Sequence, residues 1–88
     1  MPEFVQREVR ERARTPSRSD NIVVLVGYTG DGSDITEFVN EVGGEVVETL
    51  PFATLNVSIP ETALEGLLTQ PSVESVELDG GMETLQGN

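Results

Sequence analysis

The chain has 88 residues, no cysteine and no histidine, and it carries 16 acidic against five basic residues. This length suits one domain, and the missing residue types exclude disulfides, thiolate metal sites and catalysis by a Ser-His-Asp triad or a Cys-His pair. Every basic residue is an arginine between Arg7 and Arg18, so residues 19–88, with 13 acids, have a formal charge of −13.

This acidic part argues against nucleic acid as a partner, because phosphate contacts need cationic side chains. No apolar run is long enough to cross a membrane, so no membrane partner is predicted. The N-terminus lacks the apolar segment of a signal peptide, which predicts a cytoplasmic chain, or an extracellular one if it is excised from a secreted precursor.

The absence of lysine, combined with so many acids, resembles proteins adapted to nearly saturated salt, where counter-ions screen self-repulsion. An ordinary acidic soluble domain is the alternative. The halophilic interpretation predicts that secondary structure strengthens between low and molar salt, which circular dichroism measures.

Residues 1–20 are predicted to be a flexible arm rich in arginine and glutamate. Charges alternate in sign from Arg7 to Arg14, and Thr15-Pro16-Ser17 interrupts any helix. The apolar residues of the arm form a stripe too narrow to stabilise an isolated helix of this length: Phe4, Val5 and Val9. A basic patch for an acidic partner is the alternative, but three glutamates dilute its charge.

The first regular pattern is a β-branched run from Ile22 to Val26, which predicts a central strand buried on both faces. Asp34 and Glu37 match a capping box, in which the aspartate accepts from an early backbone N–H and the glutamate reaches back to the cap. Gly43-Gly44 ends the helix that follows, since glycine adopts the left-handed conformation without steric cost. The apolar face of this helix consists of Ile35, Phe38, Val39 and Val42.

A pair of strands is predicted next, at residues 45–50 and 55–59. A turn at Pro51-Phe52-Ala53 joins them. Apolar and polar residues alternate in the second strand, as expected when one face of a sheet is exposed to water.

The remaining pattern predicts a helix and a last strand. Pro60 suits the first turn of this helix, which Pro71-Ser72 ends, and residues 73–78 form the strand. The buried stripe of the helix is Leu64, Leu67 and Leu68. On the strand, Val76 and Leu78 lie on one side and Glu77 and Asp79 on the other.

The predicted order is therefore β-α-β-β-α-β. Right-handed crossovers place both helices on one face of the sheet. The predicted fold class is α+β, a ferredoxin-like sandwich with a four-stranded antiparallel sheet. The domain spans residues 21–80 and is followed by a flexible tail at residues 81–88, which has no apolar periodicity.

This fold offers little depth for catalysis, because one layer of helices on a small sheet makes no cleft that would perturb the pKa values of paired carboxylates. We predict no enzyme activity and no cofactor. The segment Asp31-Gly32-Ser33-Asp34 lacks the remaining ligands of a calcium loop, so we interpret it as a turn with a helix cap and predict no metal site. An ACT-like regulatory domain that binds a small molecule or dimerises needs no catalytic residue and stays open.

Three segments, in this order, resemble the propeptide/inhibitor family of subtilisin-like serine proteases: residues 39–46 (VNEVGGEV), 60–65 (PETALE) and 71–79 (PSVESVELD). The resemblance covers about residues 21–85. It implies a non-catalytic, monomeric domain that acts as an inhibitor and intramolecular folding chaperone of its protease. The sheet face would dock on two surface helices of the enzyme, and the C-terminal tail would fill the substrate cleft.

The resemblance also assigns site residues. Acids of the last strand cap the enzyme's helices in that family, and Glu77 and Asp79 match those positions; helix N-termini favour carboxylates because of their free N–H groups and dipole. Solvated acids at a strand edge are the alternative. The family's last residue before the scissile bond aligns with Leu85, which would enter the primary specificity pocket.

Met82 would enter the apolar pocket three residues upstream of Leu85, with Glu83 and Thr84 between them. The tail would pair with the enzyme by β-augmentation; a C-terminus without a role is the alternative. Gln86-Gly87-Asn88 continues past the expected end. We therefore expect either a stand-alone inhibitor that its target trims after Leu85 or an excised propeptide. An interaction domain without a protease target is the third possibility.

Overall fold

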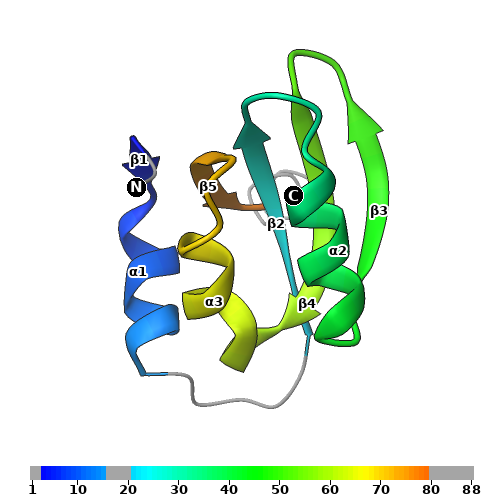
Figure 1. The fold of residues 1–88 in the computed structure, drawn as a ribbon. Helices are drawn as coiled ribbons and strands as arrows, with labels where there is room; N and C mark the ends of the chain where they lie inside the picture. The colour runs from blue at the N-terminus through cyan, green and yellow to red at the C-terminus, as the bar shows by residue number, and fades with distance from the viewer. Residues whose placement is uncertain (1–2, 16–20, 80–88) are drawn as a thin grey trace, which may run out of the picture.

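The computed structural model describes residues 3–15 and 21–79. Within these residues it shows an α+β fold with three α-helices and a five-stranded mixed sheet (Figure 1). The elements, in chain order, are β1 (Phe4–Val5), α1 (Arg7–Arg14), β2 (Asn21–Tyr28), α2 (Ser33–Glu41), β3 (Glu45–Leu50), β4 (Thr54–Pro60), the short 3-10 helix η1 (Glu61–Ala63), α3 (Leu64–Leu68) and β5 (Val73–Leu78).

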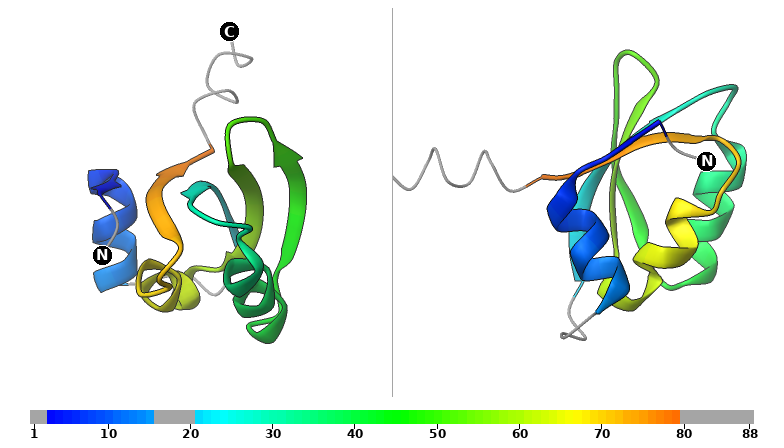
Figure 2. Two further views of the ribbon diagram at one scale, coloured as in Figure 1. Left: turned by 45° about the horizontal axis from the view of Figure 1, so that its top comes forward. Right: turned by 90° about the vertical axis from the view of Figure 1, so that its left-hand side faces the viewer.

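The strand order in the sheet is β1-β5-β2-β4-β3. Four strands pair antiparallel, as predicted, but β1 adds a fifth strand that pairs parallel with β5. The helices lie on one side of the sheet: in the left panel of Figure 2, α2 and α3 lie below the strands and α1 lies beside β5 at the left. The α+β class is therefore confirmed, whereas the four-stranded ferredoxin-like sheet with two helices is not the complete architecture.

The core lies between the sheet and this helical layer. Ile22, Val24 and Val26 of β2 are buried, whereas Val23 is 37% exposed. The prediction that β2 is buried on both faces is wrong, because helices cover only one face of the sheet and the strand therefore alternates. The other side chains that are fully buried are Val9, Ile35, Val39, Val57, Ile59, Leu64, Leu67 and Val76.

The N-terminal segment departs most from the sequence prediction. Residues 3–15 do not form a flexible arm: β1 pairs with β5, and α1 contacts α3, η1 and β5. Val5, Val9 and Ala13 are buried in the common core. Val9 and Ala13 lie one turn apart on α1, whereas Val5 reaches the core from β1. The helical stripe is too narrow for an isolated helix, but the neighbouring elements bury it.

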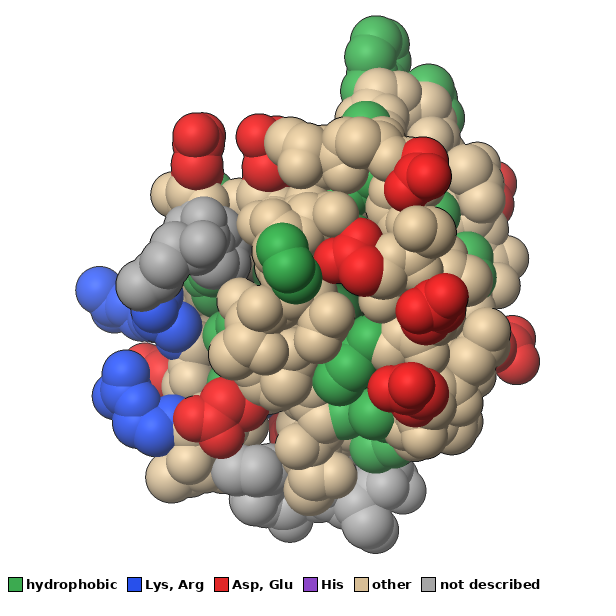
Figure 3. All heavy atoms as spheres, viewed as in Figure 1, with side chains coloured by type: hydrophobic (Ala, Val, Ile, Leu, Met, Phe, Trp, Pro, Cys, Tyr) green, Lys and Arg blue, Asp and Glu red, His purple; other side chains and the backbone are tan. Residues whose placement is uncertain are grey.

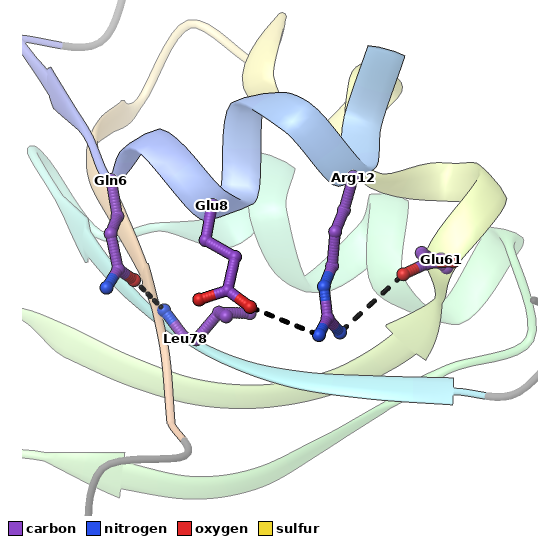
Figure 4. A network of polar contacts seen from close by, with 5 residues as sticks. All are labelled: Gln6, Glu8, Arg12, Glu61 and Leu78. Carbon is purple, nitrogen blue, oxygen red and sulfur yellow. Dashed lines mark hydrogen bonds and ion pairs between the residues drawn. The ribbon is translucent and has the colours of Figure 1, made fainter. Parts of the chain in front are cut away.

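Arg12 joins this segment to the rest of the domain by ion pairs. Its guanidinium lies 3.2 Å from a carboxylate oxygen of Glu8 on the same helix and 3.6 Å from one of Glu61 in η1 (Figure 4). Glu61 is only 3% exposed. Since a buried carboxylate is costly without compensating charge, the arginine-rich helix supplies a cation to an otherwise acidic domain.

The two adjacent glycines after α2 have separate roles. Gly43 has φ of +82°, the left-handed conformation expected of a residue that ends a helix. At Gly44, a Cβ atom would collide with the backbone carbonyl oxygen of Ser58 on β4. The first glycine therefore ends the helix, as predicted, and the second lets the chain pass closely over β4.

The predicted capping box is absent at the start of α2. The N-cap is Gly32, without a side-chain cap, and the N–H of Ser33 donates to Oδ1 of Asp31 at 3.0 Å. Asp34 lies inside the first turn, where its Oδ2 accepts from the N–H of Ser72 at 3.3 Å. This hydrogen bond to the turn before β5 replaces the predicted local cap, because the tertiary fold brings the N–H of Ser72 within reach of the Asp34 carboxylate.

Acid is expected to weaken the domain through Asp34. Hydrogen bonds from Ser72, first from its hydroxyl and then from its N–H, hold the pKa of Asp34 below its ordinary value of 3.8. A lowered native pKa stabilises the fold above pH 3.8, and this stabilisation is lost as the pH falls through the native pKa. Urea unfolding between pH 7 and pH 2.5 should show a smaller acid loss in Asp34→Asn. Glu65→Gln, which removes one exposed charge on α3, is the control and should keep the wild-type pH dependence.

Candidate functional site

One face of the sheet is free of helices in the described part of the chain. We call it the open face, and its members alternate with the buried residues of each strand. The register places the following side chains there: Phe4 of β1; Ser75 and Glu77 of β5, with Asp79 beyond it; Val23, Leu25 and Gly27 of β2; Thr54, Asn56 and Ser58 of β4; and Glu45, Glu48 and Leu50 of β3.

The centre of this face is apolar and its sides are acidic. Val23 is 37% exposed, and Leu25, which is half-buried, lies between Glu77 on one side and Asn56 on the other. Glu45 and Glu48 line the β3 side of the face. An apolar strip with carboxylates on both sides has the composition of a protein interface, whose apolar centre is surrounded by a polar rim.

The two acids predicted from the last strand are both on this face. Glu77 is exposed and lies opposite Leu25. Asp79 is half-buried: its N–H donates to the carbonyl oxygen of Val23 at 3.0 Å, and its Oδ2 accepts from Nδ2 of Asn56 at 2.8 Å. Asn56 therefore fixes the orientation of the Asp79 carboxylate across β2, whereas Glu77 projects into solvent.

Asn56 was not predicted as a site residue, although it makes this contact. Its Oδ1 atom is buried and has no hydrogen-bond partner among the residues that the structure describes. The alternation of β4 indicated that Asn56 faces outward. Only the strand order places β4 and the end of β5 on either side of β2, so the sequence carried no signal for the pair of Asn56 and Asp79.

Phe4 is a second residue that sequence reasoning missed. β1 places it opposite Ser75 on the open face, with 53% of its side chain exposed. The signal was the Phe4-Val5 pair, in which one apolar residue faces the core and its neighbour the opposite side, directly before a helix. The alternating charges of residues 1–20 predict an arm and give no weight to this apolar pair.

Gln6 holds the end of β5, immediately before Asp79. Its N–H donates to the carbonyl oxygen of Val76 at 3.0 Å, and its side-chain Oε1 accepts from the N–H of Leu78 at 2.7 Å (Figure 4). The side chain thus continues the ladder of β1 by one bond. The N-terminal segment therefore fixes the position from which the C-terminal residues depart.

The remaining predicted site residues, Met82, Glu83, Thr84 and Leu85, lie outside the described residues. Within the described ranges, no group of three or more His, Cys, Asp or Glu residues could hold a metal ion. No helix in those ranges is long and apolar enough to cross a membrane.

Comparison with known proteins gives one family. Residues 4–79 match the model of the family described as "Putative peptidase inhibitor domain". No significant match was found among curated proteins or among solved structures. The matched region begins in β1 and ends at Asp79, so it includes α1 as well as the complete sheet. The chain therefore belongs to this peptidase inhibitor family, which implies a peptidase as its partner and a non-catalytic role.

Proposed function

We propose that the domain inhibits a subtilisin-like serine protease by docking its open face on the enzyme and placing its C-terminal residues in the substrate cleft. The observation that carries the proposal is the open face itself, where Glu77 lies beside Leu25 and Asp79 lies beside the exposed Val23. The same contacts would let the domain act as a folding chaperone, because a surface complementary to the native enzyme stabilises that state.

The two carboxylates suit the N-termini of surface helices. Free N–H groups and the helix dipole stabilise an anion there by about 0.3–1 kcal/mol, and by up to about 2 kcal/mol in partly buried sites. Asp79 is already oriented by Asn56, so less conformational entropy is lost on docking. Glu77 is exposed and would reach the second helix.

The tail is long enough for its proposed role. Leu85 is the sixth residue after Asp79, and an extended chain covers at most about 3.3–3.6 Å per residue, or about 20 Å over this distance. Backbone pairing with the edge of the cleft would fix the tail, and the side chains of Met82 and Leu85 would supply selectivity.

Titration of a subtilisin-type serine protease with the full chain, in molar salt, tests the proposal. The full chain should inhibit, and the double variant Glu77→Gln, Asp79→Asn should inhibit more weakly by at most about tenfold. Two caps of about 0.7 kcal/mol each sum to about 1.4 kcal/mol at low ionic strength, and molar salt screens part of this. The matched control, Glu37→Gln with Glu65→Gln, removes the same charge from exposed positions on α2 and α3.

The outcomes separate the function from the site. Lack of inhibition by the full chain would overturn the proposed function. Equal weakening in both double variants would show that only total charge matters, and it would remove Glu77 and Asp79 from the site.

A further inference from the structure

The β3–β4 hairpin ends in a phenylalanine that packs against almost nothing. Phe52 is 94% exposed, and among the described residues the next most exposed large hydrophobic side chain is Phe4 at 53%. Pro51 and Ala53 beside it are exposed as well. In Figure 3 the hairpin projects at the top of the molecule and ends in hydrophobic side chains.

The backbone of this turn is also unusual for its residues. Phe52 and Ala53 have φ angles of +64° and +52°. This left-handed region suits glycine or asparagine and disfavours a bulky side chain. The turn is held by two bonds: the hydroxyl of Thr54 donates to the carbonyl oxygen of Phe52 at 3.1 Å, and the N–H of Tyr28 donates to that of Ala53 at 3.0 Å.

Neither burial nor turn preference therefore explains a phenylalanine at position 52. Left-handed conformations in residues that disfavour them are concentrated at functional sites, where the surrounding structure imposes them. An aromatic side chain has only two rotatable χ angles, so it loses little conformational entropy on binding for the area that it buries. These are the properties of an anchor residue in a protein interface.

A second copy of the chain does not suit this anchor. Residues 21–79 contain no lysine or arginine, so two copies would bring acidic surfaces together. One aromatic side chain buries about 150–250 Å², whereas a stable interface needs about 800 Å² on each partner. Phe52 must therefore belong to a larger contact area.

The open face supplies that area and is continuous with the hairpin. Leu50 and Thr54, the last pair before the turn, both lie on it. At this end of the sheet Gly27 of β2 lies opposite Thr54 of β4. Gly27 is four residues further along β2 than Val23, whose carbonyl oxygen accepts a hydrogen bond from the N–H of Asp79. At about 3.3 Å per residue these two positions on β2 are about 13 Å apart.

We propose that Phe52 inserts into an apolar surface pocket of the same protease that the open face contacts, at the end of the interface opposite the C-terminal tail. The proposal rests on the proposed function for the identity of the partner. The C-terminal tail and the β3–β4 hairpin would then contact the protease at opposite ends of the open face.

Substitutions at position 52 test this anchor because they separate binding from stability. Phe52→Gly and Phe52→Asn suit the left-handed backbone, so the thermal unfolding midpoint should stay the same or rise. Binding to a subtilisin-type protease whose catalytic serine is replaced by alanine, measured by calorimetry in molar salt, should weaken about tenfold or more, because the burial of one aromatic side chain is lost. Phe52→Trp should restore binding.

Each outcome is decisive. If Phe52→Gly and Phe52→Asn bind the protease as tightly as the wild-type chain does, the anchor is overturned while the proposed function stands. Binding without inhibition in a parallel assay with active protease overturns the proposed function, and calorimetry still measures the anchor. A lower unfolding midpoint in both variants gives Phe52 a structural role and overturns the proposal. Wild-type chain that does not bind overturns both proposals. A dimer in sedimentation that depends on Phe52 overturns the anchor alone, because the inhibition assay tests the proposed function separately.

Discussion

Replacing Val9 with aspartate is expected to unfold the domain. Val9 is completely buried in α1 and belongs to the same core as the sheet and α3. An unpaired carboxylate at such a site costs several kcal/mol, and a domain of this size has a total stability of about 5–15 kcal/mol. Circular dichroism in molar salt should show loss of the native spectrum, or a urea midpoint lowered by most of its wild-type value.

Val47→Asp is the matched control, because it makes the same substitution at a valine that is 49% exposed on β3. We expect it to change the free energy of unfolding by less than about 1 kcal/mol. If Val9→Asp were as mild as Val47→Asp, α1 would not be docked in solution, and residues 1–20 would behave as the flexible arm that their composition predicts.

A chain that ends at Gly81 is expected to lose at least 100-fold in inhibition of its protease. Under the proposed function, Met82 and Leu85 each fill an apolar pocket, and burying such a side chain contributes about 1.5–3 kcal/mol. Two of them account for about 3 kcal/mol or more, which is more than two factors of ten in the inhibition constant. Progress curves with a peptide substrate, in molar salt, measure this constant.

A chain that ends at Leu85 is the control for this truncation. It lacks only the three residues beyond the proposed cleavage position and should inhibit as the full chain does. Both truncations keep residues 3–79, which contain every described element, so their unfolding midpoints should match the wild type. If the chain that ends at Gly81 inhibits as strongly as the full chain, the tail has no part in the mechanism, and the open face alone must account for inhibition.

Much of the fold could be predicted from local pattern. The run from Ile22 to Val26 marked the central strand, and Gly43-Gly44 marked the end of α2, as the structure confirms. Strands β3, β4 and β5 lie close to the predicted residues 45–50, 55–59 and 73–78. Pro60 was predicted in the first turn of the following helix. In the structure it is the last residue of β4 and the N-cap of η1.

The candidate site was only partly predictable. Glu77 and Asp79 were placed on the outward side of the last strand from its alternation, and the structure puts them there. Their neighbours on the open face come from strands distant in sequence. Phe4 and Asn56 reach this face only through the strand order, which no local pattern encodes.

The sequence by itself determined where strands β2 to β5 and helix α2 lie, because the local pattern of apolar residues and turn residues marks each of these elements. The tertiary structure alone decided the state of residues 3–15, the partner of Asp34 and the left-handed turn at Phe52. In each of these places, long-range contacts override or replace a local preference. A narrow apolar stripe becomes a buried helix, a helix cap becomes a bond to Ser72, and a phenylalanine occupies a conformation that suits glycine.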